Sequence, residues 1–229
     1  MNDRYNAFGN NPLRTQSTTT VLDSAAHRVL RNTYMLLSLC LGFAALTAGT
    51  SAAMGLPHPG IIITLLGYFG LLFLVTKYRD SGAGIALVFA LTGFMGYTLG
   101  PIISQYLHMP NGSQIVMTAL GGTAAIFLGL SAYALISKRD MSFMGGFLAI
   151  GILVAFLAGL AAIFLNIPAL SLTVSAVFVL LMSGMILYET SNIIRGGETN
   201  YVMATLSLFV SIFNLFTSLL HLLGFAGKE

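Results

Sequence analysis

Glu189 is the one formally charged residue within the long apolar segments that make up most of this 229-residue chain. A charged group inside a membrane is costly to keep, so such residues usually mark an ion path, a proton relay or a paired polar site. A lone carboxyl group in this setting can exchange a proton or bind a cation. Glu189 is therefore the first candidate functional residue.

A stripe of polar residues runs along the last apolar segment, residues 201–225. Its members recur at steps of four and three residues, which places them on one face of a helix: Ser207, Ser211, Asn214, Ser218 and His221. Asn200 begins the same face. Polar groups avoid lipid, so we expect this face to meet protein or water. Two alternatives stay open, hydrogen bonds between helices and a hydrated surface that lines an ion path.

Glu189 is expected to meet this stripe. It lies six residues before Arg195, about 9 Å along a helix, and Ser207 is at a matching depth in the next span. Asn192 is on the same helical face as Glu189. In the structural alternative, hydrogen bonds to Asn192 and the stripe pin two helices together. In the functional alternative, Glu189 binds or gates a cation in a pH-dependent way.

The sequence does not favour other chemistry. Cys40 is the only cysteine, so an intramolecular disulfide is impossible. The histidines have no metal-ligand spacing, and of the four only His221 falls within a span. There is no nucleophile–base pair and no phosphate-binding loop. We therefore expect no enzymatic activity, no bound metal, no cofactor and no nucleic-acid partner.

The elements that must position Glu189 are membrane helices. Charged residues are 7% of the chain and hydrophobic residues 56%, which leaves too few charges for the surface of a soluble domain. The apolar runs are continuous and of the length that spans a bilayer as a helix. We predict an all-α membrane protein with seven spans, at residues 33–55, 59–77, 82–106, 113–136, 142–165, 169–194 and 201–225. Gly100-Pro101 is expected to kink the third.

The basic residues predict the orientation of these spans. Nine of the ten fall on one side: Arg4, Arg14, Arg28, Arg31, Lys77, Arg79, Lys138, Arg139 and Arg195. Lys228 alone falls on the other. The positive-inside rule then places the N-terminus in the cytoplasm and, with an odd number of spans, the C-terminus outside.

The N-terminal segment is polar and has few apolar anchors. We expect residues 1–28 to form a disordered cytoplasmic tail and residues 29–226 to form the transmembrane domain. His27, Arg28 and Arg31 form a basic collar before the first span. This collar is either a topology anchor or a contact for anionic lipid or a partner.

Several motifs resemble the Bax inhibitor family of seven-helix membrane proteins. They are Thr92-Gly93-Phe94-Met95-Gly96-Tyr97-Thr98-Leu99-Gly100-Pro101, Lys138-Arg139-Asp140-Met141-Ser142, Tyr188-Glu189-Thr190-Ser191-Asn192-Ile193-Ile194, and Asn214-Leu215-Phe216 to Leu223-Gly224. The likeness covers about residues 20–226. The loop at 196–201 and the stretch at 29–34 look most like the bacterial YccA branch of the family.

The resemblance implies a fold of six helices around a central seventh. It also implies two activities recorded in the family, a pH-sensitive calcium leak governed by a pair of intramembrane acids, and, in the bacterial branch, binding and modulation of the FtsH membrane protease. The acid of the sixth helix corresponds to Glu189, but the acid of the seventh corresponds to Ser211. One carboxylate and a serine cannot titrate as a coupled pair.

The expected function is that of a multi-pass protein of the bacterial inner membrane that binds and modulates FtsH and has no catalysis of its own. An ATP-driven protease needs a disordered end from which to pull, and the tail would supply one. The alternative is a pH-sensitive calcium or cation leak channel with Glu189 on the ion path. A purely structural membrane protein is a third, weaker reading.

Overall fold

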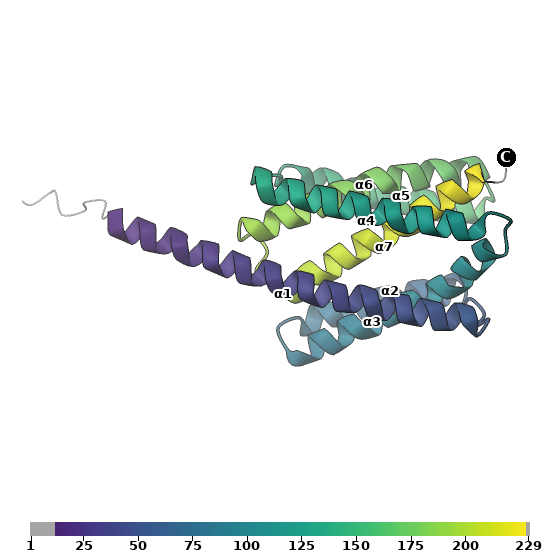
Figure 1. Ribbon diagram of the computed structural model, residues 1–229, viewed down its shortest axis with the longest axis horizontal. Coiled ribbons are helices and arrows are strands. Elements are labelled where there is room, and N and C mark those ends of the chain that lie inside the picture. Colours follow the sequence, from purple (N-terminus) through teal and green to yellow (C-terminus); the bar gives the residue numbers. More distant parts are fainter. Residues whose placement is uncertain (1–11, 228–229) are drawn as a thin grey trace, which may run out of the picture.

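Seven helices make up the protein in a computed structural model that describes residues 12–227, with side chains from Ser24 onward. In chain order these are α1 (Pro12–Ala53), α2 (Ile61–Tyr78), α3 (Gly82–Leu107), α4 (Gly112–Ser137), α5 (Met144–Phe164), α6 (Pro168–Ile194) and α7 (Tyr201–Ala226). Each contains a segment long and apolar enough to cross a membrane. The predicted all-α, seven-span architecture is confirmed over these residues (Figure 1).

The beginning of α1 corrects the predicted tail. α1 starts at Pro12, so residues 12–28 are helical and the prediction of disorder was wrong for them. Proline is well tolerated in the first turn of a helix, and extending a helix that is already nucleated costs little. This N-terminal part of α1 projects beyond the other helices (Figure 1). Residues 1–11 lie outside the described residues.

The ends of the helices follow from local backbone chemistry. Gly55 and Gly60 adopt positive φ angles of 61° and 89° in the connection from α1 to α2, a conformation that glycine enters without steric cost. Pro168 begins α6, where its missing N–H costs no helical hydrogen bond. These signals are local, so the sequence locates the breaks between spans well.

α7 occupies the inner part of the bundle. It packs against α6, α4, α1 and α3, and buries thirteen of its residues. α2 and α5 lie further out, and most of their side chains are partly or fully exposed. A helix so placed explains the polar stripe, because its serines and asparagine are kept away from lipid.

α1 and α3 approach each other closely along a seam of glycines. A Cβ atom on Gly96 would collide with the backbone oxygen of Ala44, and one on Gly100 would collide with Ser51. Pro101 follows directly and has no N–H to offer the carbonyl oxygen of Tyr97 one turn earlier. The hydroxyl of Ser51 donates to that oxygen instead, at 3.0 Å. The carbonyl freed by the proline is thus satisfied by a neighbouring helix.

Candidate functional site

Glu189 is buried in the last two turns of α6, with 6% of its surface exposed. The hydroxyl of Ser207 on α7 hydrogen-bonds to its carboxyl group, and Glu198 in the α6–α7 loop is close enough to interact with it electrostatically. The structure therefore brings together Glu189 and Ser207, as their matching depths suggested. The proximity of Glu198 was not anticipated, because it depends on how the loop folds back.

The N-terminal half of the polar stripe lines a cavity of about 620 Å³. Ser207, Ser211 and Asn214 form one wall, and α2, α5 and α6 supply most of the others. The Ser211 hydroxyl donates to the carbonyl oxygen of Ser207 at 2.8 Å, and the Asn214 amide donates to that of Val210 at 2.8 Å. These groups are therefore bonded to their own helix while facing the cavity.

The remaining wall of this cavity is mainly apolar and aromatic. Phe69 of α2 and Phe156 of α5 meet edge to face, with ring centroids 5.9 Å apart, and both line the cavity. Ser207 lines the cavity and also bonds Glu189. One hydroxyl group thus separates the buried carboxyl group from the cavity, an arrangement suited to proton exchange between them.

The C-terminal half of the stripe, Ser218 and His221, does not line this cavity. The Ser175 hydroxyl of α6 lies 2.8 Å from Nδ1 of His221. His221 also lines a second cavity of about 470 Å³, together with Gln105 and Tyr106 of α3. Ser218 is buried. The single polar surface expected from the helical spacing is therefore divided between two cavities at different depths.

Asn192 lies at the end of α6, where the chain turns toward α7. Its carbonyl oxygen accepts hydrogen bonds from the N–H groups of Gly197 at 2.9 Å and Glu198 at 3.4 Å. A Cβ atom on Gly197 would collide with the Asn192 side chain. Asn192 is thus part of this turn, and its predicted role beside Glu189 stays a prediction.

The α6–α7 connection holds the α4–α5 loop. The Arg195 guanidinium is 2.9 Å from a carboxylate oxygen of Asp140, and the Ser191 hydroxyl donates to the carbonyl oxygen of Arg139 at 2.7 Å. Hydrogen bonds from the backbone and hydroxyl of Ser142, with a smaller contribution from Arg195, lower the pKa of Asp140 below its ordinary value. The Lys-Arg-Asp-Met-Ser motif is therefore a docked loop.

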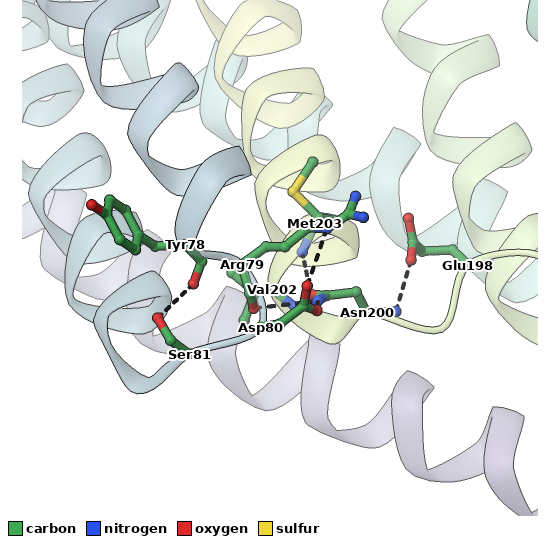
Figure 2. Close-up of polar contacts among 8 residues, drawn as sticks. All are labelled: Tyr78, Arg79, Asp80, Ser81, Glu198, Asn200, Val202 and Met203. Atoms are coloured by element: carbon green, nitrogen blue, oxygen red, sulfur yellow. Dashed lines mark hydrogen bonds and ion pairs between the residues drawn. The ribbon is translucent and has the colours of Figure 1, made fainter.

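The same connection also holds the α2–α3 loop, through Asn200 (Figure 2). The Asn200 side-chain oxygen accepts from the N–H groups of Val202 and Met203, at 2.9 and 3.1 Å, and so caps α7. Its amide nitrogen donates to Asp80 at 2.7 Å and to the carbonyl oxygen of Arg79 at 3.2 Å. An asparagine just before a helix is a strong capping signal, which the assignment of Asn200 to the stripe overlooked.

These contacts place the three loops at one end of the bundle, which we call the basic end. It carries Lys77, Arg79, Lys138, Arg139 and Arg195. Among the residues that the structure describes, no group of three or more His, Cys, Asp or Glu side chains could hold a metal ion. Calcium prefers six to eight oxygen ligands, many more than Glu189 and Ser207 supply.

Comparison with known proteins defines the class of protein. The family described as "Inhibitor of apoptosis-promoting Bax1" matches residues 26–228, and the chain belongs to this Bax inhibitor family. The chain is 55% identical over 205 residues to "Modulator of FtsH protease YccA" of Escherichia coli strain K12, covering 90% of this chain and 93% of that protein. The resemblance to the bacterial YccA branch is confirmed.

Other relatives are similar over comparable lengths. A sequence from another Escherichia coli strain with the same identity carries the name "Inner membrane protein YccA". The chain is also 54% identical over 201 residues to "Uncharacterized protein PA2604" of Pseudomonas aeruginosa, covering 88% of this chain and 90% of that one. With its seven membrane helices, the protein is a multi-pass protein of the bacterial inner membrane.

Proposed function

We propose that this protein binds and modulates the FtsH membrane protease and has no catalytic activity of its own. The observation that carries the proposal is the 55% identity, over 90% of the chain, to a protein named as a modulator of FtsH. The aligned 205 residues cover most of the seven-helix domain.

The basic end offers a defined surface for such a partner. Arg195 and Asn200 hold the α4–α5 and α2–α3 loops against the α6–α7 connection, so the three loops form one ordered face. The N-terminal part of α1 projects beyond the bundle on its own (Figure 1). A helix without close neighbours opens at little free-energy cost, and an ATP-driven protease would have an end to pull.

Co-purification tests the proposal directly. A C-terminally tagged protein, isolated from detergent-solubilised inner membranes, should retain FtsH, while an unrelated multi-pass protein with the same tag should not. Deletion of residues 2–20 should lengthen the lifetime of the protein in cells that contain FtsH, because the end to be pulled is missing. Arg28 and Arg31 remain in this variant to keep the topology. Absence of FtsH from the purified protein would contradict the proposal.

A cation leak is the second candidate function. It is favoured by the buried Glu189, which is bonded to a hydroxyl that lines the 620 Å³ cavity. Ser211 weakens this candidate, since a second acid is missing from α7. Glu189→Gln should abolish any pH dependence of calcium flux into liposomes, and Ser211→Asp should strengthen it by restoring a coupled pair. Flux at the protein-free background in wild type and both variants would exclude the leak.

A further inference from the structure

A cavity of about 470 Å³ opens between α1 and α4 near the basic end. Its lining is His27, Arg28, Leu30, Arg31, Tyr34 and Leu135. The five residues from α1 lie where its membrane segment, Ser24–Ala53, begins, and Leu135 lies in the last turn of α4. α1 packs mainly against α3, α7 and α6, which leaves room beside α4.

Two buried hydroxyl groups, those of Tyr34 and Ser131, belong to the helices α1 and α4 that border this cavity. The ring of Tyr34 packs against that of Phe127 of α4, with centroids 5.9 Å apart. Tyr34 also lines the cavity together with Leu135. Ser131 lies midway between Phe127 and Leu135, four residues from each, so it is on the α4 face that Tyr34 meets. Ser131 is 4% exposed.

Neither the Tyr34 nor the Ser131 hydroxyl has a hydrogen-bond partner among the residues that the structure describes. A buried polar group without a partner costs about 1–3 kcal/mol, so each such group needs an explanation. A polar ligand that enters from the cavity above would supply the missing partners.

The charge of the cavity indicates which ligand. The side chains of Arg28 and Arg31 are exposed, and neither forms an ion pair with an acid of the described chain. Guanidinium groups bind phosphate with paired hydrogen bonds. Basic pockets between membrane helices at the interface bind anionic lipid headgroups.

The face of α1 below the two arginines suits the rest of a lipid. Met35 and Leu39 continue the same helical stripe, and their side chains are exposed. Acyl chains attached to a headgroup at the arginines would lie along these apolar side chains. A free phosphate ion would gain nothing from this part of the surface.

We propose that this cavity binds the headgroup of an anionic phospholipid. The phosphate lies between Arg28 and Arg31, the headgroup and glycerol oxygens reach toward the hydroxyls of Tyr34 and Ser131, and the acyl chains follow α1. The basic collar is then a specific lipid site in addition to being a determinant of orientation. This site is separate from Glu189 and its cavity, and does not depend on the proposed function.

Native mass spectrometry of the full-length protein in detergent can measure this binding. We expect dioleoylphosphatidylglycerol to bind more tightly than dioleoylphosphatidylcholine. Arg28→Gln/Arg31→Gln should weaken binding of the anionic lipid about thirtyfold, since each basic residue near a membrane surface contributes roughly 1 kcal/mol. Lys138→Gln/Arg139→Gln is the matched control, because it removes the same charge from the same end but outside the cavity.

The hydroxyl groups provide a second measurement. Tyr34→Phe and Ser131→Ala should each weaken binding of the anionic lipid severalfold and leave the lipid-free protein folded, since both remove only unpartnered groups. If the double arginine variant does not fold, the single variant Arg28→Gln takes its place. Equal losses in the Arg28/Arg31 and Lys138/Arg139 variants would show a general surface-charge effect and overturn the proposal. Equal affinity for both lipids, or displacement by inorganic phosphate at equimolar concentration, would overturn it too.

Discussion

The contact between Ser51 and Tyr97 shows how one side chain allows a proline inside a membrane helix. Pro101 leaves the Tyr97 carbonyl oxygen without its usual donor, and no water is present in the hydrocarbon to replace it. The Ser51 hydroxyl supplies the bond at 3.0 Å. Since this carbonyl is occupied, it is a structural feature and not a free ligand for an ion.

Ser51→Ala should destabilise the protein by about 1 kcal/mol, because it leaves a half-buried carbonyl unpaired between α1 and α3. Thr50→Ala is the control, since the Thr50 hydroxyl is exposed and bonds only within α1, to Leu46 and Thr47. The free energy of unfolding, measured by denaturant titration in mixed micelles, checks the difference. Equal effects of the two substitutions would contradict this role of Ser51.

Asp140 should make the stability of the protein depend on acid pH. Its pKa is lowered in the folded protein, so its contribution is fully present above the ordinary carboxyl pKa, about 3.9, and is lost as the pH falls through the lower folded value. The wild type should therefore lose more thermal stability than Asp140→Asn between pH 5 and pH 3. Melting temperatures of the two proteins, measured in detergent between about pH 5 and pH 3, check this expectation.

Salt provides the control for Asp140, because exposed charges are screened. The stabilisation that Asp140 gains from Arg195 should shrink in about 1 M salt, while the stabilisation from the Ser142 hydrogen bonds should persist. Identical pH profiles for wild type and Asp140→Asn would show that the loop contact does not contribute to stability.

At the scale of elements, the connection between α6 and α7 organises the basic end. Arg195 holds the α4–α5 loop and Asn200 holds the α2–α3 loop, so two loops far apart in sequence depend on one short segment. Glu189 is in the last two turns of α6, and Glu198 interacts with it from the same segment. A change in this connection therefore reaches both the loops and the buried carboxyl group.

The two functions of Asn200 can be separated by substitution. Asn200→Ala should remove both the α7 cap, worth about 1 kcal/mol, and the contact with Asp80. Asn200→Asp keeps a capping oxygen but loses the donor to Asp80, and places two acids side by side. Both variants should be cleaved faster by trypsin after Lys77 or Arg79, while only Asn200→Ala should lose the full capping energy. Unchanged cleavage in both would mean that Asn200 does not restrain this loop.

At the scale of the whole molecule, the distribution of charge predicts a single orientation. Nine of ten basic residues fall in the N-terminal segment or at the basic end. The contacts of Arg195 and Asn200 gather the three basic loops on one face of the fold, as that prediction requires.

Reporter fusions test the orientation. An enzyme that is active only outside the cytoplasm should be active when fused after Gly227 and silent when fused after Arg139. The reason is the basic end, which the membrane-insertion machinery retains on the cytoplasmic side. Activity after Arg139, or silence after Gly227, would contradict the predicted topology.

The spans themselves were predictable from the sequence. α6 was predicted at residues 169–194 and is Pro168–Ile194, and α7 was predicted at 201–225 and is Tyr201–Ala226. Bilayer thickness demands about twenty apolar residues in a row, and Pro, Gly and charged residues interrupt such runs. The contact between Glu189 and Ser207 was also predictable from the sequence, because depth in a membrane can be counted along each helix.

Other features required the tertiary structure. The disorder predicted for residues 12–28 was wrong, because composition alone does not reveal that a membrane helix continues into a polar segment. The docking of Asp80 on Asn200, the division of the polar stripe between two cavities and the unpartnered hydroxyls of Tyr34 and Ser131 depend on which helices lie side by side. The sequence by itself determines which segments enter the bilayer, since that depends on the free energy of transfer of each segment. Only the packed bundle decides which polar groups meet, because lipid provides no hydrophobic force to choose among helix pairs and the choice depends on the fit of their surfaces.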